Sequence, residues 1–192
     1  MTMLLIGLLI FLGAHSVRIF AEPWRQAQIA RMGAGAWKGA YSLVSLAGLA
    51  LIVWGYGVAR AVPVELWASP GWMRHLSSLL NVGAFVLLAA AYVPRNRIRV
   101  EAGHPMVAGV ALWALAHLLS NGRLADLVLF GAFLAWGLLD FRAARARDRE
   151  AGVRRAPGTP GGDLAVLAVG IAAAAVFALW LHGPLVGVRP FG

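Results

Sequence analysis

Residues 164–181 read LAVLAVGIAAAAVFALWL, eighteen consecutive residues without a charged side chain. Such a segment is typical of a transmembrane helix, because crossing the hydrocarbon core of a bilayer takes about 20 mainly apolar residues. Five further segments approach this length and composition: Met3–Phe20, Ala40–Ala59, Leu76–Val93, Pro105–Leu119 and Leu124–Phe141. The sequence therefore predicts an all-α protein, a polytopic transmembrane helical bundle of about six helices.

The composition agrees with this fold class. The 192 residues are 60% hydrophobic and 13% charged, whereas soluble domains carry about 25% charged residues. The absence of cysteine excludes disulfides and thiolate metal sites. We attribute the net charge of +9 to arginines that face the cytoplasm and anionic lipid, because no basic stretch is interleaved with aromatic residues on a soluble unit. The expected partner is the lipid bilayer, and no nucleic acid is expected.

Basic residues are distributed unevenly among the loops. With six spans, the first, third and fifth loops and their flanks hold thirteen of the 17 basic residues. The positive-inside rule then places these loops in the cytoplasm and both termini in the periplasm, for a multi-pass protein of the bacterial inner membrane. We expect Met3–Phe20 to be a retained helix and no signal peptide, because no charged side chain precedes Arg18 and no clear cleavage site is present.

We predict three parts along the chain. Residues 1–141 form a five-helix transmembrane body. Residues 142–163 form a cytoplasmic linker that begins with arginines spaced along a helical extension and ends in proline and glycine, which favour flexibility. Residues 164–192 form the last transmembrane helix and a short tail. Within the body, Pro105–Leu119 is the shortest span, so it either tilts little or is partly buried in protein.

Five histidines lie at or near helical positions, namely His15, His75, His104, His117 and His182. Polar groups at membrane depth are costly, so each is a candidate cofactor-binding residue. Under the predicted topology, His75, His117 and His182 lie toward the outer ends of their helices, as Asp126 does. His15 and His104 lie in the cytoplasmic half. This distribution does not require that the helices be neighbours.

Structural roles compete with ligand roles at each histidine. Interfacial capping or a hydrogen bond between helices is favoured for His75 and His182, which lie at membrane edges. His104 precedes Pro105 at a helix start, an arrangement that is also explained by structure alone. His117 lies within the apolar stretch Trp113–Leu119. For this histidine the ligand role and the structural role are equally favoured.

The chemistry of imidazole narrows the choice of cofactor. Catalytic zinc usually takes three protein ligands, and acids are scarce at depth in this chain. Haem b needs one or two histidines in an apolar pocket, which suits this chain better. Arg18, Arg74 and Arg123 are candidates to neutralise a haem propionate, although each could be a topology anchor. Nucleophilic catalysis has no support, since cysteine, a G-x-S-x-G motif and paired carboxylates are absent from the sequence, and no catalytic residue is predicted.

Several long stretches resemble the NnrU family of bacterial membrane proteins. They are Phe11–Arg18, Lys38–Ser45, Gly103–Val110, Trp113–Gly122, Leu129–Gly131 and His182–Val188. The family is associated with denitrification, through the expression of nitrite and nitric oxide reductases. The resemblance therefore implies a physiological setting for this chain, and it does not imply a reaction.

A plant relative of this family, zeta-carotene isomerase, contains haem b and isomerises a carotene double bond. Its W-x-x-A-H pattern resembles Trp113–His117, and the resemblance implies His117 and His15 as the metal ligands. The relative has a cysteine where this chain has Ala114, so a cysteine-for-histidine ligand switch is not available here. Depth places His15 and His117 on opposite sides of the midplane, offset by roughly 10–12 Å. Other pairs therefore stay open: His15 with His104, or His117 with His75 or His182.

A weaker similarity links Gly103–Gly109 to the R-H-P-x-Y-x-G pattern of membrane methyltransferases. Gly103 and Val107 replace the arginine and the tyrosine of that pattern. The acidic motif of those enzymes is not visible. A shared fold is plausible on this resemblance, but S-adenosylmethionine binding is not favoured.

Three functions follow as hypotheses. The first is a haem b protein that handles or senses nitrogen oxides or electrons, with His117 as the best single ligand. The second is a cofactor-free transporter or assembly factor for denitrification enzymes, packed on Gly48, Gly55, Gly109 and Gly131. The third is a haem-dependent isomerase or redox enzyme that acts on a lipophilic polyene.

Overall fold

The computed structural model describes residues 1–191, so Gly192 of the predicted tail lies outside the described residues. Almost all regular structure in this range is helical, and one isolated β-bridge joins Glu65 to Arg123. The elements in chain order are α1 (Thr2–Phe20), α2 (Glu22–Met32), α3 (Ala34–Ala61), α4 (Met73–Tyr92), α5 (Arg97–Ala102), α6 (Pro105–Ser120), α7 (Leu124–Glu150), α8 (Pro160–Val176), the π-helical turn η1 (Phe177–Leu181) and α9 (His182–Val186). The prediction of an all-α bundle is confirmed.

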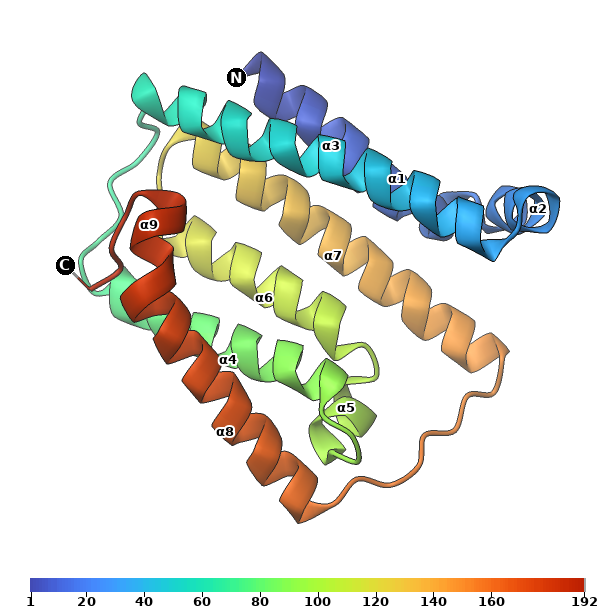
Figure 1. Ribbon diagram of the computed structural model, residues 1–192. Coiled ribbons are helices and arrows are strands. Elements are labelled where there is room, and N and C mark those ends of the chain that lie inside the picture. The colour runs from blue at the N-terminus through green and yellow to red at the C-terminus, as the bar shows by residue number, and fades with distance from the viewer. Residues whose placement is uncertain (192) are drawn as a thin grey trace.

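Five helical stretches within the described residues are long and apolar enough to cross a membrane. They are α1, α3, α4, α7 and the continuous stretch from α8 to α9. The sixth predicted span, α6, has 16 residues and packs between α4 and α7 (Figure 1). This helix is shorter than the roughly 20 residues that usually cross the hydrocarbon core, and it has protein on two sides, as the expectation of partial burial in protein implies.

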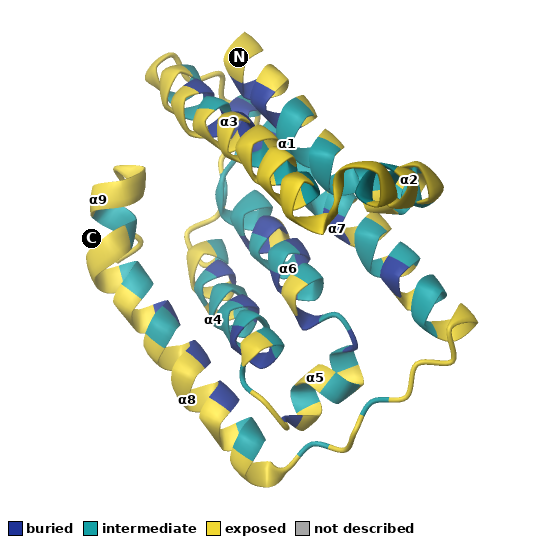
Figure 2. Ribbon diagram, turned by 45° about the vertical axis from the view of Figure 1, so that its right-hand side comes forward, coloured by how far each residue is buried: buried dark blue, intermediate teal, exposed yellow. Residues whose placement is uncertain are grey.

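The spanning helices form a curved row in the order α3, α1, α7, α6, α4, α8 (Figure 1). The row therefore does not follow chain order, because α7 lies between the α1–α3 pair and the α4–α6 pair. At one end the row is bridged, since the Arg60 side chain at the end of α3 donates a hydrogen bond of 2.8 Å to the Val186 carbonyl in α9. Buried residues lie where the helices face each other, and the outer faces are exposed (Figure 2).

Glycines set the separation of neighbouring helices. A Cβ on Gly48 would lie 2.8 Å from the backbone nitrogen of Phe11, and one on Gly109 would lie 3.0 Å from the Ala84 carbonyl oxygen. Gly55 likewise faces the backbone of α1. The predicted packing role therefore holds at these three positions. It does not hold at Gly131, where the nearest side chain belongs to α7 itself.

The two ends of the bundle differ in how the helices are connected. At the end that we call the loop end, residues 62–72 connect α3 to α4 and lie against the α6–α7 turn. At the opposite end, the linker end, α7 continues to Glu150, well beyond the predicted limit of its span at Phe141. The following segment is extended until Pro160, where α8 begins. This segment is held to the α4–α5 turn, because Thr159 donates a backbone hydrogen bond of 2.8 Å to the Arg95 carbonyl.

Candidate functional site

His15 lies in α1 with one ring nitrogen committed to its own helix. Its Nδ1 lies 2.7 Å from the carbonyl oxygen of Phe11. A carbonyl oxygen can only accept, so Nδ1 carries the proton and the neutral ring keeps a lone pair on Nε2. The imidazole stacks on Phe11 at 4.2 Å between centroids, and it lies 5.2 Å from the Tyr41 ring and 5.9 Å from the Trp136 ring. His15 therefore leaves Nε2 as its available nitrogen, within a cage of aromatic rings.

Two unused polar groups lie near this cage. The indole Nε1 of Trp136 and the hydroxyl of Ser45 are buried without a hydrogen-bond partner. Gly48 packs on Phe11 across the antiparallel α1–α3 pair, so Ser45, about one turn before Gly48, lies level with His15. Buried polar groups are nearly always hydrogen-bonded in folded proteins. The orphaned donors thus mark the surroundings of His15 as a place where a polar ligand group would be stabilised.

His117 in α6 repeats the arrangement of His15. Its Nδ1 donates a hydrogen bond of 2.8 Å to the carbonyl oxygen of Trp113, one turn earlier, which again leaves the lone pair on Nε2. The ring stacks on Phe130 of α7 at 4.6 Å and lies 5.2 Å from the Trp113 ring. His117 is half-buried, in an apolar part of the fold.

A row of aromatic side chains separates the two histidines. Phe133 of α7 lies 5.8 Å from the Phe11 ring on one side and 5.6 Å from the Trp113 ring on the other. His15 extends this row at the α1 side and His117 extends it at the α6 side. The two imidazoles therefore do not contact each other, and they lie on opposite sides of α7.

The other three histidines differ in their polar partners. His104 Nε2 lies 2.9 Å from Asp148 at the linker end. His182 Nδ1 donates a hydrogen bond of 2.6 Å to the Val188 carbonyl, and His75 is exposed at the start of α4. Across residues 1–191, no hydrogen bond or ring contact joins two histidines, and no group of three metal-ligating side chains occurs.

The three arginines considered for a propionate have different partners. Arg123 pairs with Glu65 at 3.4 Å between Nε and Oε1. Arg74 is exposed near the start of α4. Arg18 is exposed one turn beyond His15, toward the linker end. Arg18 therefore lies within one turn of His15 on α1, and Arg74 is adjacent to His75 on α4.

A buried carboxylate is stabilised at the loop end. Asp126 is 3% exposed and accepts a hydrogen bond of 2.5 Å from the Tyr56 hydroxyl, together with one of 3.4 Å from the Arg123 backbone at the start of α7. The sequence pointed to Asp126 but not to Tyr56, because 70 residues separate the two partners. Trp136 and Ser45 were missed for the same reason, since each is an ordinary residue of an apolar helix until its neighbours are known.

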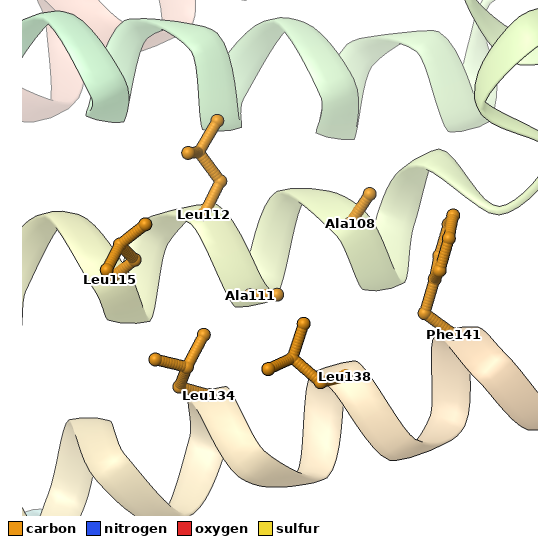
Figure 3. Close-up of a pocket in the computed structure, with 7 residues that line it drawn as sticks. All are labelled: Ala108, Ala111, Leu112, Leu115, Leu134, Leu138 and Phe141. Carbon is orange, nitrogen blue, oxygen red and sulfur yellow. The ribbon is translucent and has the colours of Figure 1, made fainter.

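Two apolar grooves lie on the helix row. One has a volume of about 280 Å³ and lies between α6 and α7, where Leu112, Leu134 and Phe141 are among its lining residues (Figure 3). The other has a volume of about 300 Å³ and lies between α1 and α7, against Leu8 and Val128. Neither groove is lined by a histidine.

A row of apolar helices with charged ends defines a multi-pass membrane protein. Comparison with known families identifies the group more closely: a family model described as "NnrU protein" matches residues 3–190. The chain belongs to the NnrU family. No curated protein and no solved structure matches the chain.

Proposed function

We propose that this NnrU-family protein binds haem b through a membrane-embedded histidine and thereby senses or handles a nitrogen oxide or an electron. The setting would be denitrification in a bacterial inner membrane, with the linker end in the cytoplasm because most basic residues lie there. The observation that carries the proposal is shared by His15 and His117. Each ring donates Nδ1–H to its own helix and so leaves Nε2 as the available ligand atom, the arrangement that orients metal-bound histidines.

His15 fits this role better than His117. It has three aromatic neighbours that exclude water, two orphaned donors close by, and Arg18 one turn away to neutralise a propionate. His117 has the same free Nε2 but no orphaned donor. This ranking differs from the expectation from sequence, in which His117 was the best single candidate.

The two histidines do not fit as a pair on one iron in this packing, because the row through Phe133 lies between them. Coordination by one histidine is therefore the arrangement that we propose. A haem held by a single histidine has an open position at which a small ligand can bind. This agrees with the nitrogen oxide branch of the proposal, and the half-buried aromatic residues around His15 would keep water from that position.

The test is the visible spectrum of protein purified after expression with a haem precursor, with a pyridine haemochrome assay for stoichiometry. His15→Ala should lose the Soret band, whereas His75→Ala, which changes an exposed histidine, should keep it. Loss of the Soret band in His117→Ala alone would mean that the haem ligand is on α6. A stoichiometric Soret band that persists in both His15→Ala and His117→Ala would contradict the proposed ligands.

A spectrum without haem in the parent protein would contradict the proposal as a whole. It would favour the cofactor-free transporter or assembly factor, for which the close packing at Gly48, Gly55 and Gly109 already provides a rigid scaffold. Turnover of a polyene by the reduced protein would instead favour the isomerase alternative.

A further inference from the structure

The groove between α6 and α7 has a polar end that the haem proposal does not use. Its walls are entirely apolar side chains, and it opens outward at Leu115 and Leu138, which are exposed (Figure 3). At about 280 Å³ it is at the small end of ligand pockets, which span roughly 300–1,000 Å³. The outer wall of such a groove is completed by the hydrocarbon of the bilayer. Its shape therefore suits one acyl chain lying along the helices.

Phe141 connects the groove to a group of cationic side chains. Its ring lines the linker end of the groove, and the guanidinium of Arg145 lies 5.8 Å from the ring centroid. The His104 imidazole meets the same ring edge-on at 6.5 Å. A Cβ placed on Gly103 would lie 3.4 Å from Arg145 Nη1 and 3.6 Å from the nearer Arg155 nitrogens. Two guanidinium groups and one imidazole thus converge where the groove ends.

The carboxylate within this group is already engaged. Asp148 lies on the part of α7 beyond the apolar span, accepts a hydrogen bond from Arg155, and lies 2.9 Å from His104 Nε2. The hydrogen bond from Arg155 lowers the pKa of the Asp148 carboxyl. Asp148 therefore holds Arg155 and His104 in place. Arg145 forms no ion pair within residues 1–191, so its charge is available to another anion.

We infer that this site binds an anionic phospholipid, with one acyl chain in the α6–α7 groove and the headgroup phosphate on Arg145. Charge complementarity selects the headgroup, since an arginine fork binds phosphate through paired hydrogen bonds. The apolar side chains that line the groove favour the lipid acyl chain as its occupant. Arg155, which Asp148 holds in place, adds a second guanidinium next to Arg145 at Gly103. This inference does not rest on the proposed function, because none of these residues belongs to the His15 or His117 surroundings.

The test is native mass spectrometry of the full chain in detergent, titrated with phosphatidylglycerol or with phosphatidylcholine. The parent should retain phosphatidylglycerol in preference to phosphatidylcholine. Arg145→Gln should weaken phosphatidylglycerol binding roughly fivefold, the effect of one basic residue near an anionic headgroup. Arg149→Gln removes the same charge from the next turn of α7, where the side chain is exposed, and should leave binding unchanged.

A second pair of variants tests the groove itself. Ala108→Phe places a ring in the groove and should reduce the retention of both lipids, whereas Ala175→Phe on the exposed face of α8 should not. Inorganic phosphate should fail to compete, because it lacks the chain. Competition by phosphate would reduce the site to an anion site without a lipid. Equal lipid retention in the parent, Arg145→Gln and Ala108→Phe would overturn the inference, and this readout by mass is independent of any haem spectrum.

Discussion

The hydroxyl of Tyr56 donates a hydrogen bond of 2.5 Å to the carboxylate of Asp126, across the interface between α3 and α7. Asp126 also accepts a hydrogen bond from the backbone N–H of Arg123, the N-cap residue of its own helix. The pair therefore fixes the loop end of α7 against a helix that has few other contacts with it.

Removal of this hydroxyl should destabilise the protein. Tyr56→Phe leaves a buried carboxylate short of one donor, which costs about 1–3 kcal/mol. We expect a lower midpoint of thermal unfolding in detergent. Tyr92→Phe is the matched control, because Tyr92 is 74% exposed, and it should leave the midpoint unchanged. Equal midpoints for the two variants would mean that the Tyr56 contact contributes nothing.

The α1–α3 contact should be sensitive to a single methyl group. In Gly55→Ala the new Cβ would meet the backbone of Leu4, and overpacking of this kind costs about 1–3 kcal/mol. Gly57→Ala adds the same group where nothing lies within 4 Å, so it should be neutral or slightly stabilising. Thermal unfolding of both variants measures the difference, and a neutral Gly55→Ala would show that α1 can shift away from α3.

The loop end should depend on glycine at position 122. The Gly122 carbonyl accepts backbone hydrogen bonds of 2.8 and 3.2 Å from Leu66 and Trp67, and a Cβ on Gly122 would meet the Trp67 carbonyl. Gly122→Ala should therefore release this loop, at a cost of about 1–3 kcal/mol. Hydrogen exchange of residues 62–72 would rise, whereas Gly71→Ala, with open space around it, would not change it.

The extended segment after α7 should open when Asp148 loses its charge. Asp148→Asn weakens the contact with Arg155. Loss of this contact should raise the population of the open segment severalfold. Trypsin should then cleave after Arg154 and Arg155 correspondingly faster. Glu150→Gln removes an exposed charge two residues further on and should leave the cleavage rate unchanged; equal rates in both variants would exclude Asp148 as the anchor.

Apolar length was sufficient to predict the spans but not all of their limits. Leu124–Phe141 was recognised because a bilayer demands such a stretch. The helix continues to Glu150, in agreement with the helical extension expected there, because the Arg and Ala residues that follow are good helix formers in water. The short helices Glu22–Met32 and Arg97–Ala102 escaped prediction, since neither has the length or the periodicity that identifies a helix.

The sequence was sufficient to name the candidate histidine ligands, but it did not predict how they are arranged relative to one another. Depth along the chain placed His15 and His117 on opposite sides of the midplane, but it contained no lateral information. The structure adds that α7 and its Phe133 lie between them. The choice of ring nitrogen depends on carbonyl groups one turn away, and the orphaned donors near His15 depend on α3 and α7. Such relations arise from packing between distant segments, and composition does not encode them.

The position of α7 in the helix row has a consequence for biogenesis. The α1–α3 and α4–α6 hairpins both leave the ribosome before α7, yet α7 is the helix that contacts both of them, through α1 and α3 on one side and α6 on the other. The two hairpins are therefore expected to remain separate in the bilayer until α7 inserts. The faces that α7 later covers are exposed to lipid until then. Tertiary assembly begins when the fifth span inserts between them, so a chain that stops after Ser120 would yield two unjoined hairpins.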